Sequence, residues 1–229
     1  MELRANDGRE EKVEYSGATY ERLPVKTCLV TSEHNLNDVL VEYVKPHLKK
    51  GDIVFVSEKM VSCSEGRTVK LEDVKVSRLA RLLSRFVEPT YSEGLGLPQT
   101  MQTAIDEVGA IRIVFAAAAG AVGKILRRRG WFYVIAGPRV SHIDGPSLRT
   151  LPPYDQEIVL CALEPDKDAE EASRILGVDV VIVDANPVAL RLCGTSNKDI
   201  TEEWLNEVLR DNPLGQATQR TPCGIIRKV

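Results

Sequence analysis

Residues 51–67 read Gly51-Asp52-Ile53-Val54-Phe55-Val56-Ser57-Glu58-Lys59-Met60-Val61-Ser62-Cys63-Ser64-Glu65-Gly66-Arg67. The β-branched and aromatic run at 53–56 is typical of a buried strand. Hydroxyls, carboxylates and cations follow it directly, together with a glycine, whose backbone reaches conformations closed to other residues. The pattern predicts a strand that delivers these groups to one place, in a ligand-facing turn or a cap. A strand followed by a solvated helix start is the alternative.

The chain has 229 residues, enough to bury a substantial core without disulfides. We expect a single domain over residues 1–229, with residues 1–19 as a candidate flexible N-terminus. Its five cysteines contain no CxxC pair, which predicts reduced thiols: Cys28, Cys63, Cys161, Cys193 and Cys223.

Composition and charge argue against several classes of partner. The three histidines lack zinc-ligand spacing, and a net charge of -3 gives no footprint for nucleic acid. Residues 1–12 contain no apolar signal region, and no segment approaches the about 20 apolar residues of a membrane span. We therefore expect a cytoplasmic protein that binds neither nucleic acid nor membrane.

Strand-like and helix-like patterns alternate along the chain, without repeats. The expected strands cover 20–31, 53–56, 111–116, 131–136, 157–163, 178–183 and 223–229. The expected helices cover 35–48, 76–86, 98–108 and 166–176, and a further helix begins at Thr201. This order predicts an α+β (mixed α/β) fold, whose strand order stays open.

Three loops besides 57–67 gather polar groups at the ends of expected elements: 137–147, 183–187 and 212–222. Residues 120–124 contain Gly-Lys but are not a phosphate-binding loop. Ala118 stands where the first glycine is required, and Ile125 replaces the magnesium-binding hydroxyl.

Several segments together resemble the coenzyme F-420-0:L-glutamate (gamma-glutamyl) ligases. The resemblance covers nearly the whole chain, in the family's order, although each motif alone is weak. The matching segments are Leu23-Pro24-Val25, Gly51-Asp52-Ile53-Val54, Ser62-x-Ser64-Glu65-Gly66-Arg67, Ala136-Gly137, Leu151-Pro152-Pro153-Tyr154-Asp155, Val180-Val181-Ile182-Val183-Asp184, and Gly215 with Pro222 and the strand after it.

The resemblance implies a two-lobed fold assembled as an intertwined homodimer. It also implies a cytoplasmic, GTP-binding and metal-binding enzyme that uses Mg²⁺ or Mn²⁺. Such a ligase phosphorylates a carboxylate, and the amine of L-glutamate then displaces phosphate to form an amide in coenzyme F-420 biosynthesis. Its partners are small molecules: a nucleotide, glutamate and a carboxylate acceptor, here a deazaflavin cofactor precursor.

The resemblance also assigns roles to residues. Asp184 is the expected metal ligand, and it shares the expected catalytic role with Arg139. The expected nucleotide-binding residues are Glu58, Lys59, Ser62, Arg67, His142, Gly215 and Gln216.

The chain departs from the family pattern at three positions. Arg139 stands where the family has a metal-binding aspartate, and a guanidinium cannot ligate a cation but can hold an anion directly. Ala185 replaces a threonine, and Cys63 replaces a lysine. A catalytically silent relative that binds a nucleotide, a small anionic ligand or a protein is therefore the alternative function. Arg67 has a structural alternative as well, an ion pair with a buried carboxylate.

Overall fold

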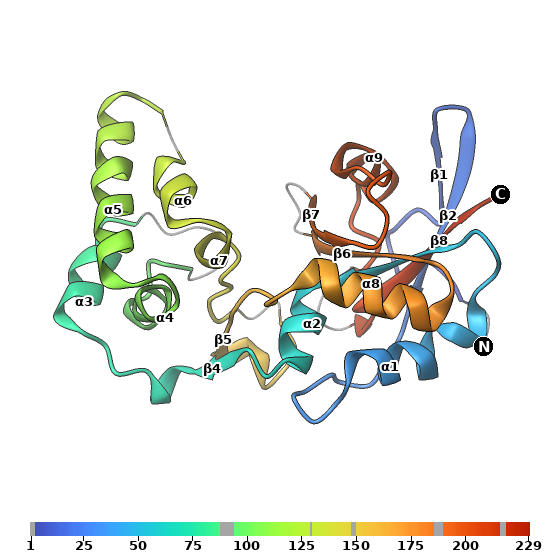
Figure 1. Cartoon of the computed structure of the whole chain (residues 1–229), viewed down its shortest axis with the longest axis horizontal. Helices are drawn as coiled ribbons and strands as arrows, with labels where there is room; N and C mark the ends of the chain where they lie inside the picture. The colour runs from blue at the N-terminus through green and yellow to red at the C-terminus, as the bar shows by residue number, and fades with distance from the viewer. Residues whose placement is uncertain (1–2, 88–93, 129, 148–149, 186–189, 216–218) are drawn as a thin grey trace. The chain divides into compact units, whose positions relative to one another are not determined.

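A computed structural model shows two compact units in the chain (Figure 1). It describes residues 3–87, 94–128, 130–147, 150–185, 190–215 and 219–229. Unit 1 comprises Met1–Gly66 and Ala162–Val229, and unit 2 comprises Arg67–Cys161. Unit 2 is therefore one continuous insertion into the chain of unit 1. That residues 1–229 form one family domain stays a prediction.

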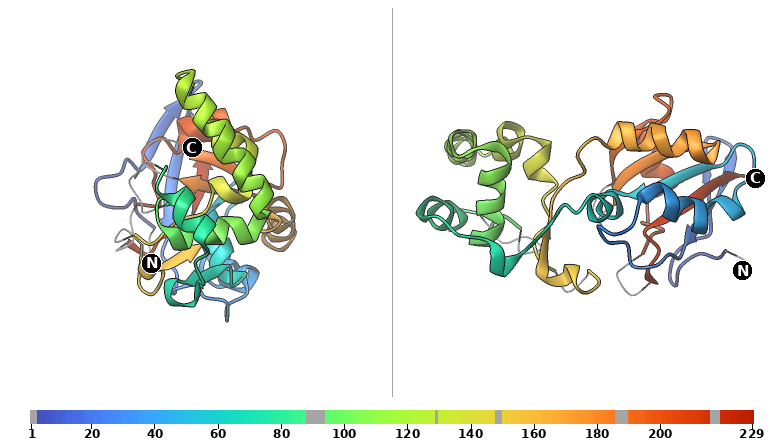
Figure 2. Two further views of the ribbon diagram at one scale, coloured as in Figure 1. Left: turned by 90° about the vertical axis from the view of Figure 1, so that its left-hand side faces the viewer. Right: turned by 60° about the horizontal axis from the view of Figure 1, so that its bottom comes forward.

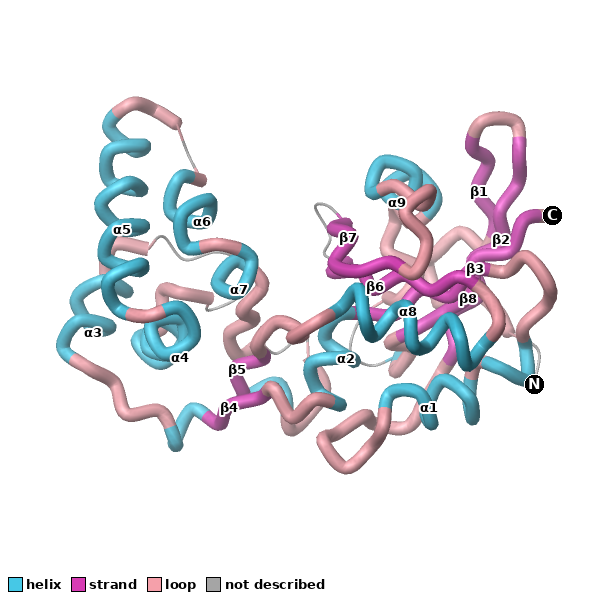
Figure 3. The backbone as a smooth tube through the Cα atoms, in the orientation of Figure 1, coloured by secondary structure: helices cyan, strands magenta, loops and turns pink. Residues whose placement is uncertain are grey.

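Unit 1 is built on a six-stranded sheet in the order β1-β2-β8-β3-β6-β7 (Figure 3). β3 and β6 pair in parallel, whereas the other neighbours pair antiparallel. The strands are β1 Lys12–Tyr15, β2 Ala18–Val25, β3 Ile53–Ser57, β6 Asp179–Ala185, β7 Leu190–Thr195 and β8 Cys223–Lys228.

The apolar run at the start of the quoted stretch forms β3, in the middle of this sheet. Val54 and Val56 join the core on one face of the sheet, and Phe55 joins the core on the other. Successive side chains of a strand point to opposite faces, so a strand covered on both faces is apolar at every position. β3 is therefore the buried strand that the sequence predicts.

Helices cover both faces of the sheet. α1 (Leu36–Tyr43), α2 (Glu58–Ser64) and α8 (Pro165–Leu176) supply the core around Val54, and α9 (Glu202–Val208) supplies the core around Phe55. A short 3-10 helix, Lys45–His47, follows α1. Asn37 of α1 donates to Glu171 of α8 over 3.1 Å, and these two helices lie side by side (Figure 2).

Two helices of unit 1 begin where the sequence places their caps. Asn35 accepts a hydrogen bond from the backbone nitrogen of Asn37 over 2.8 Å, and Thr201 accepts one from that of Trp204 over 3.2 Å. The first N–H groups of a helix have no carbonyl acceptor within the helix, and such side chains accept their hydrogen bonds instead. The predicted helices at 35–48, 166–176 and from Thr201 are confirmed, although the first ends at Tyr43.

Side chains of α9 cover the β7 edge of the sheet. Asn206 accepts from the backbone nitrogen of Leu190 over 3.1 Å and donates to its carbonyl over 3.0 Å. Glu202 accepts from the backbone nitrogen of Leu192 over 2.9 Å. These contacts occupy groups that an additional strand would need, so they protect the edge from unwanted pairing.

Unit 2 is mainly helical. Its core includes Met101, Ile113 and Ile158, all fully buried. Its elements are β4 Thr68–Lys70, α3 Arg78–Ser84, α4 Pro98–Val108, α5 Ala110–Ile125, α6 Trp131–Ala136, α7 Pro138–Ser141, β5 Glu157–Val159, and the 3-10 helices Leu71–Asp73 and Tyr154–Gln156. The predicted helices at 76–86 and 98–108 are confirmed.

Two predicted strands of unit 2 are wrong. Residues 111–116 lie in α5 and residues 131–136 form α6. The first run continues through four alanines, the strongest helix formers, and is too long for a typical strand. The second run has strand-like residues, but it packs on α5, where Phe132 lies 3.2 Å from the position of a Cβ added at Gly120. Tertiary contact overrides local preference here.

Other element boundaries also differ from the sequence-based prediction. β2 covers 18–25 rather than 20–31, and β5 ends at 159 rather than 163. β1 lies within the candidate flexible N-terminus, and β7 was not predicted. No single helix of the described residues is long and apolar enough to cross a membrane, and α4 with α5 meets that criterion only as a pair bent by 118°.

The mixed sheet and its helices confirm the predicted α+β fold class. No disulfide joins the five cysteines, all of which lie among the described residues, and their reduced state stays a prediction.

Candidate functional site

The parallel pairing of β3 and β6 determines where the polar groups of unit 1 meet. Ser57, the last residue of β3, lies opposite Val183 of β6. Glu58 follows Ser57, and Asp184 follows Val183. Because parallel strands end at the same edge of a sheet, both carboxylates lie at one edge, where α/β sheets commonly bind ligands.

Sheet alternation also places the two carboxylates on one face. Val180 and Ile182 of β6 pack in the core beneath α1, α2 and α8, and Asp184 continues that side of the strand. Glu58 is the first residue of α2, on the same face of the sheet, and is only 7% exposed. Burial removes the water that would solvate the charge of this carboxylate, so Glu58 needs polar neighbours in its place.

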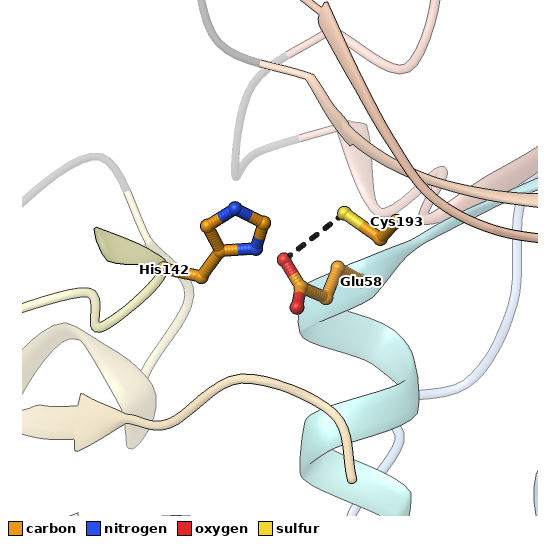
Figure 4. Close-up of side chains that lie close together, drawn as sticks. All are labelled: Glu58, His142 and Cys193. Carbon is orange, nitrogen blue, oxygen red and sulfur yellow. Dashed lines mark hydrogen bonds between the residues drawn. The ribbon is translucent and has the colours of Figure 1, made fainter. Parts of the chain in front are cut away.

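Cys193 of β7 supplies one such neighbour. Its Sγ donates to Oε2 of Glu58 over 3.3 Å, as the dashed line in Figure 4 marks. The figure also draws His142, a residue of unit 2. The register between β6 and β7 shifts beside Cys193, with Gly194 opposite Ile182 and Leu192 opposite Val183. Cys193 is the extra residue of β7 at this local bulge, and its side chain reaches Glu58 of α2.

The electrostatics of the pair keep the thiol neutral. Burial raises the pKa of Cys193, and the negative charges of Glu58 and Asp184 raise it further, against a smaller opposing effect of a backbone hydrogen bond at Asp184. Cys193 is therefore a protonated hydrogen-bond donor at neutral pH rather than a thiolate nucleophile.

The remaining predicted residues of the 57–67 segment lie on or after α2. Lys59 follows Glu58 in the first turn, and Ser62 lies one turn later on the same side as Glu58. Ser62 is 1% exposed, and its hydroxyl has no hydrogen-bond partner among the described residues. Cys63 is a buried member of the helix.

Arg67 begins unit 2 and is held by two acceptors there. Its Nη2 donates to Glu107 over 2.9 Å, and its Nε donates to the carbonyl of Cys161 over 2.6 Å. Burial works to lower the pKa of Arg67, but Glu107 outweighs burial and raises it. This ion pair matches the structural alternative for Arg67, and its role in nucleotide binding stays a prediction.

The other predicted site residues lie in separate places. Arg139 is an exposed residue of α7, and His142 is the half-buried residue that ends this helix. Gly215 lies in unit 1 with a φ of 71°, a conformation that favours glycine. Gln216 lies outside the described residues. The roles of these four residues stay predictions.

The strand-end pair Glu58 and Asp184 has the chemistry of a hard-cation site. Carboxylate oxygens are the donors that Mg²⁺ and Mn²⁺ prefer. The residues present are thus compatible with the divalent cation that the sequence predicts.

The sequence did not reveal Cys193 as part of this site. It comes from an antiparallel strand that was not predicted, and no spacing links it to residue 58, because the two positions are 135 residues apart in the chain. Only strand order and the bulge bring them together.

Unit 1 thus belongs to a class of α+β proteins that have two carboxylates at the shared edge of two parallel strands. The model of the F420-0:Gamma-glutamyl ligase family matches residues 24–197. The chain therefore belongs to this family. No curated protein matches the chain. Family membership supports a ligase function at the level of the family.

Proposed function

We propose that the chain is a gamma-glutamyl ligase that uses GTP to join L-glutamate to the carboxylate of a deazaflavin cofactor precursor. The supporting observation is that Glu58 and Asp184 each follow one member of the paired residues Ser57 and Val183, at the shared edge of β3 and β6. Membership of the F420-0:Gamma-glutamyl ligase family supplies the reaction class.

Each group of unit 1 has a role in this proposal. Glu58 and Asp184 hold Mg²⁺ or Mn²⁺, which when bound screens the charge of the triphosphate. Lys59 follows Glu58 at the start of α2 and offers a cation for a phosphate oxygen. Ser62 lies one turn after Glu58 on the same side of α2, and its hydroxyl has no partner among the described residues. Its predicted role in nucleotide binding requires α2 to open this buried hydroxyl to the ligand.

The proposed reaction has two steps. The acceptor carboxylate attacks the terminal phosphorus of GTP, the bond to the bridging oxygen of GDP breaks, and an acyl phosphate forms. The amine of glutamate then attacks the acyl carbon, a C–N bond forms, the bond to the phosphate oxygen breaks, and a proton leaves the nitrogen. The site must exclude water, which would otherwise hydrolyse the acyl phosphate.

A catalytically silent binding protein is the second candidate. Three positions favour it: Arg139, Ala185 and Cys63 stand where the resemblance expects an aspartate, a threonine and a lysine. In this case the protein binds a nucleotide, a small anionic ligand or a protein without metal, because a guanidinium holds an anion directly. Homodimeric assembly and a cytoplasmic location also belong to the main proposal.

Thermal-shift titration tests the proposal, because a ligand that binds only the folded state raises the midpoint of unfolding. We expect GTP to stabilise the protein with Mg²⁺ or Mn²⁺ and much less without either. Asp184→Asn and Glu58→Gln should each weaken metal-dependent GTP binding at least tenfold.

Glu170→Gln is the matched control, since Glu170 is an exposed carboxylate of α8. It should leave GTP binding unchanged. Stabilisation by GTP without metal would favour the silent binding protein. No response to GTP, GDP or ATP would refute the ligase proposal.

A further inference from the structure

Residues 3–11, which precede β1, lie against the rest of unit 1, and we call them the N-terminal strap. Leu3 packs against the core that α1, α2 and α8 supply. Glu10 donates its backbone N–H to Asp211 over 3.1 Å, and its side chain accepts from Arg210 over 3.0 Å. The strap is therefore fixed near both of its ends.

Asn6, between these ends, joins two parts of the polar loop 212–222. We call residues 212–215 its first limb and residues 219–222 its second limb. The Nδ2 of Asn6 donates to the carbonyl of Pro213 over 2.8 Å and to Oγ1 of Thr221 over 2.8 Å. An amide nitrogen carries two hydrogens, so these two contacts use its full donor capacity. One side chain thus ties the first limb to the second.

The contact between the two limbs is buried. Thr221 is 8% exposed, and its hydroxyl accepts from Asn6 and donates to the carbonyl of Leu214 over 2.7 Å. Pro213 is buried as well. Removal of the Asn6 amide would take a donor from two buried acceptors, which costs more than the loss of an exposed hydrogen bond.

The same loop touches both strand ends that carry the carboxylates of the proposed site. The backbone nitrogen of Ser57, at the end of β3, donates to the carbonyl of Pro222 over 2.8 Å. Asn212 donates through Nδ2 to the carbonyl of Ala185, at the end of β6, over 3.4 Å. Each limb therefore contacts one strand at the shared edge of β3 and β6.

Asn6 also lies against a predicted nucleotide-binding residue, Gly215. A Cβ added at Gly215 would lie 3.2 Å from Nδ2 of Asn6. The strap and both limbs lie outside residues 24–197, so the family match gives no role to this contact.

From these contacts we propose that Asn6 is a positioning residue of the nucleotide site, which holds the two limbs in the geometry that binds GTP. The inference rests on the proposed function, because it takes GTP with Mg²⁺ as the ligand. Asn6 acts through Pro213 and Thr221 rather than by touching the nucleotide. A loop that is already held in its binding conformation loses less conformational freedom when the ligand binds, and this raises affinity.

Calorimetric titration of the full-length protein with GTP and Mg²⁺ tests the proposal. Asn6→Ala should raise the dissociation constant at least about fivefold, because two hydrogen bonds to the loop are lost. Asn6→Asp keeps the size of the side chain but has no N–H donor, and it should have a similar effect. Asp7→Ala is the matched control, since Asp7 is an exposed residue of the same strap, and it should leave the dissociation constant unchanged.

Thr221→Val tests the same link from the loop. It keeps the volume of the side chain, removes the hydroxyl and should also weaken GTP binding. The double variant with Asn6→Ala should raise the dissociation constant by less than the product of the two single effects, because both substitutions break one shared contact. Circular dichroism verifies that the variants fold. If Asn6→Ala does not fold, Asn6→Asp and Thr221→Val supply the measurement.

A purely structural contact would give a different result. The midpoint of thermal unfolding of Asn6→Ala would fall, while the folded protein would keep the GTP affinity of the native chain, and this would overturn the inference alone. An equal loss of affinity in Asp7→Ala would overturn it too, because the effect would then not depend on the amide. A native chain that does not bind GTP would overturn the proposed function together with the inference.

Discussion

Arg22 lies in β2 with no exposed surface. Its guanidinium pairs with Asp211, with a contact of 3.2 Å between Nη2 and Oδ2, and it also donates to the carbonyl of Glu10. Asp211 keeps 24% of its side chain exposed. The two partners are therefore unequal: a lone Asp211 can be solvated, whereas a lone Arg22 cannot.

This inequality predicts an order of destabilisation. Asp211→Asn should cost about 2–3 kcal/mol of unfolding free energy, because it leaves a buried cation without its counter-charge. Arg22→Met should cost less, because an apolar stem remains in the core and water reaches Asp211. Urea denaturation measures both changes. A larger loss for Arg22→Met than for Asp211→Asn would contradict the prediction.

The same pair predicts a pH dependence. Burial favours a higher pKa for Asp211, but the hydrogen bond from Arg22 and other contacts outweigh it and lower the pKa below the ordinary value of 3.8. The folded state thus holds the proton less tightly than the unfolded state. The stabilisation is complete above pH 3.8 and is lost as the pH falls through the folded pKa. Asp211→Asn should remove this part of the acid slope, measured by urea denaturation between pH 5 and about 2.

At the scale of elements, the contact of α8 with β7 depends on one missing side chain. A Cβ at Gly194 would lie 2.3 Å from the carbonyl carbon of Pro165, at the start of α8. The backbone of Thr195 next to it donates to Asp166 of the same helix over 3.0 Å. Neither backbone can move away without breaking sheet or helix contacts.

Gly194→Ala should therefore destabilise the protein by about 3 kcal/mol, at the upper end of the cost of overpacking. Thermal and urea denaturation provide the measurement. Gly96→Ala is the control, because its added Cβ would meet nothing nearer than 3.8 Å. An equal effect of the two substitutions would show that crowding at α8 is not the cause.

Elements with local signals were predictable from the sequence. Asn35 and Thr201 have the side chains that cap helices, Pro98 opens α4, and residues 53–56 form a buried strand. The failures lie where local and tertiary preferences conflict. Residues 131–136 have a strand-like composition but form α6, which packs against the glycines of α5. β7 has no strong strand pattern of its own and forms by pairing with β6.

At the scale of the whole molecule, the two units have separate cores. Within each unit, the two points where the chain passes to the other unit are joined by a hydrogen bond. In unit 2, Leu160 donates its backbone N–H to the carbonyl of Arg67 over 2.9 Å. In unit 1, the backbone nitrogen of Leu163 donates to the carboxylate of Glu65 over 3.1 Å. Each unit therefore closes on itself where the chain passes to the other.

This closure predicts that the units fold independently. A fragment of residues 67–161 should be helical by circular dichroism and should unfold cooperatively. Residues 1–66 joined to 162–229 by a short Gly-Ser linker should keep the six-stranded sheet and the Glu58–Asp184 pair. Non-cooperative melting of the separate fragments, with cooperative melting of the intact chain, would refute independent folding.

The sequence by itself determined the fold class, most helices of unit 1, the central buried strand and the family resemblance. These features depend on periodicity, caps and short motifs, which neighbouring residues encode. Only the tertiary structure decided which groups meet. Glu58 and Asp184 share an edge because β3 and β6 pair in parallel, and Cys193 reaches Glu58 through a bulge in a neighbouring strand. The side of α5 that stays exposed, with Ile111 and Phe115, was likewise visible only in the fold, because apolar residues occur on both sides of this helix, and packing alone decides which side is buried.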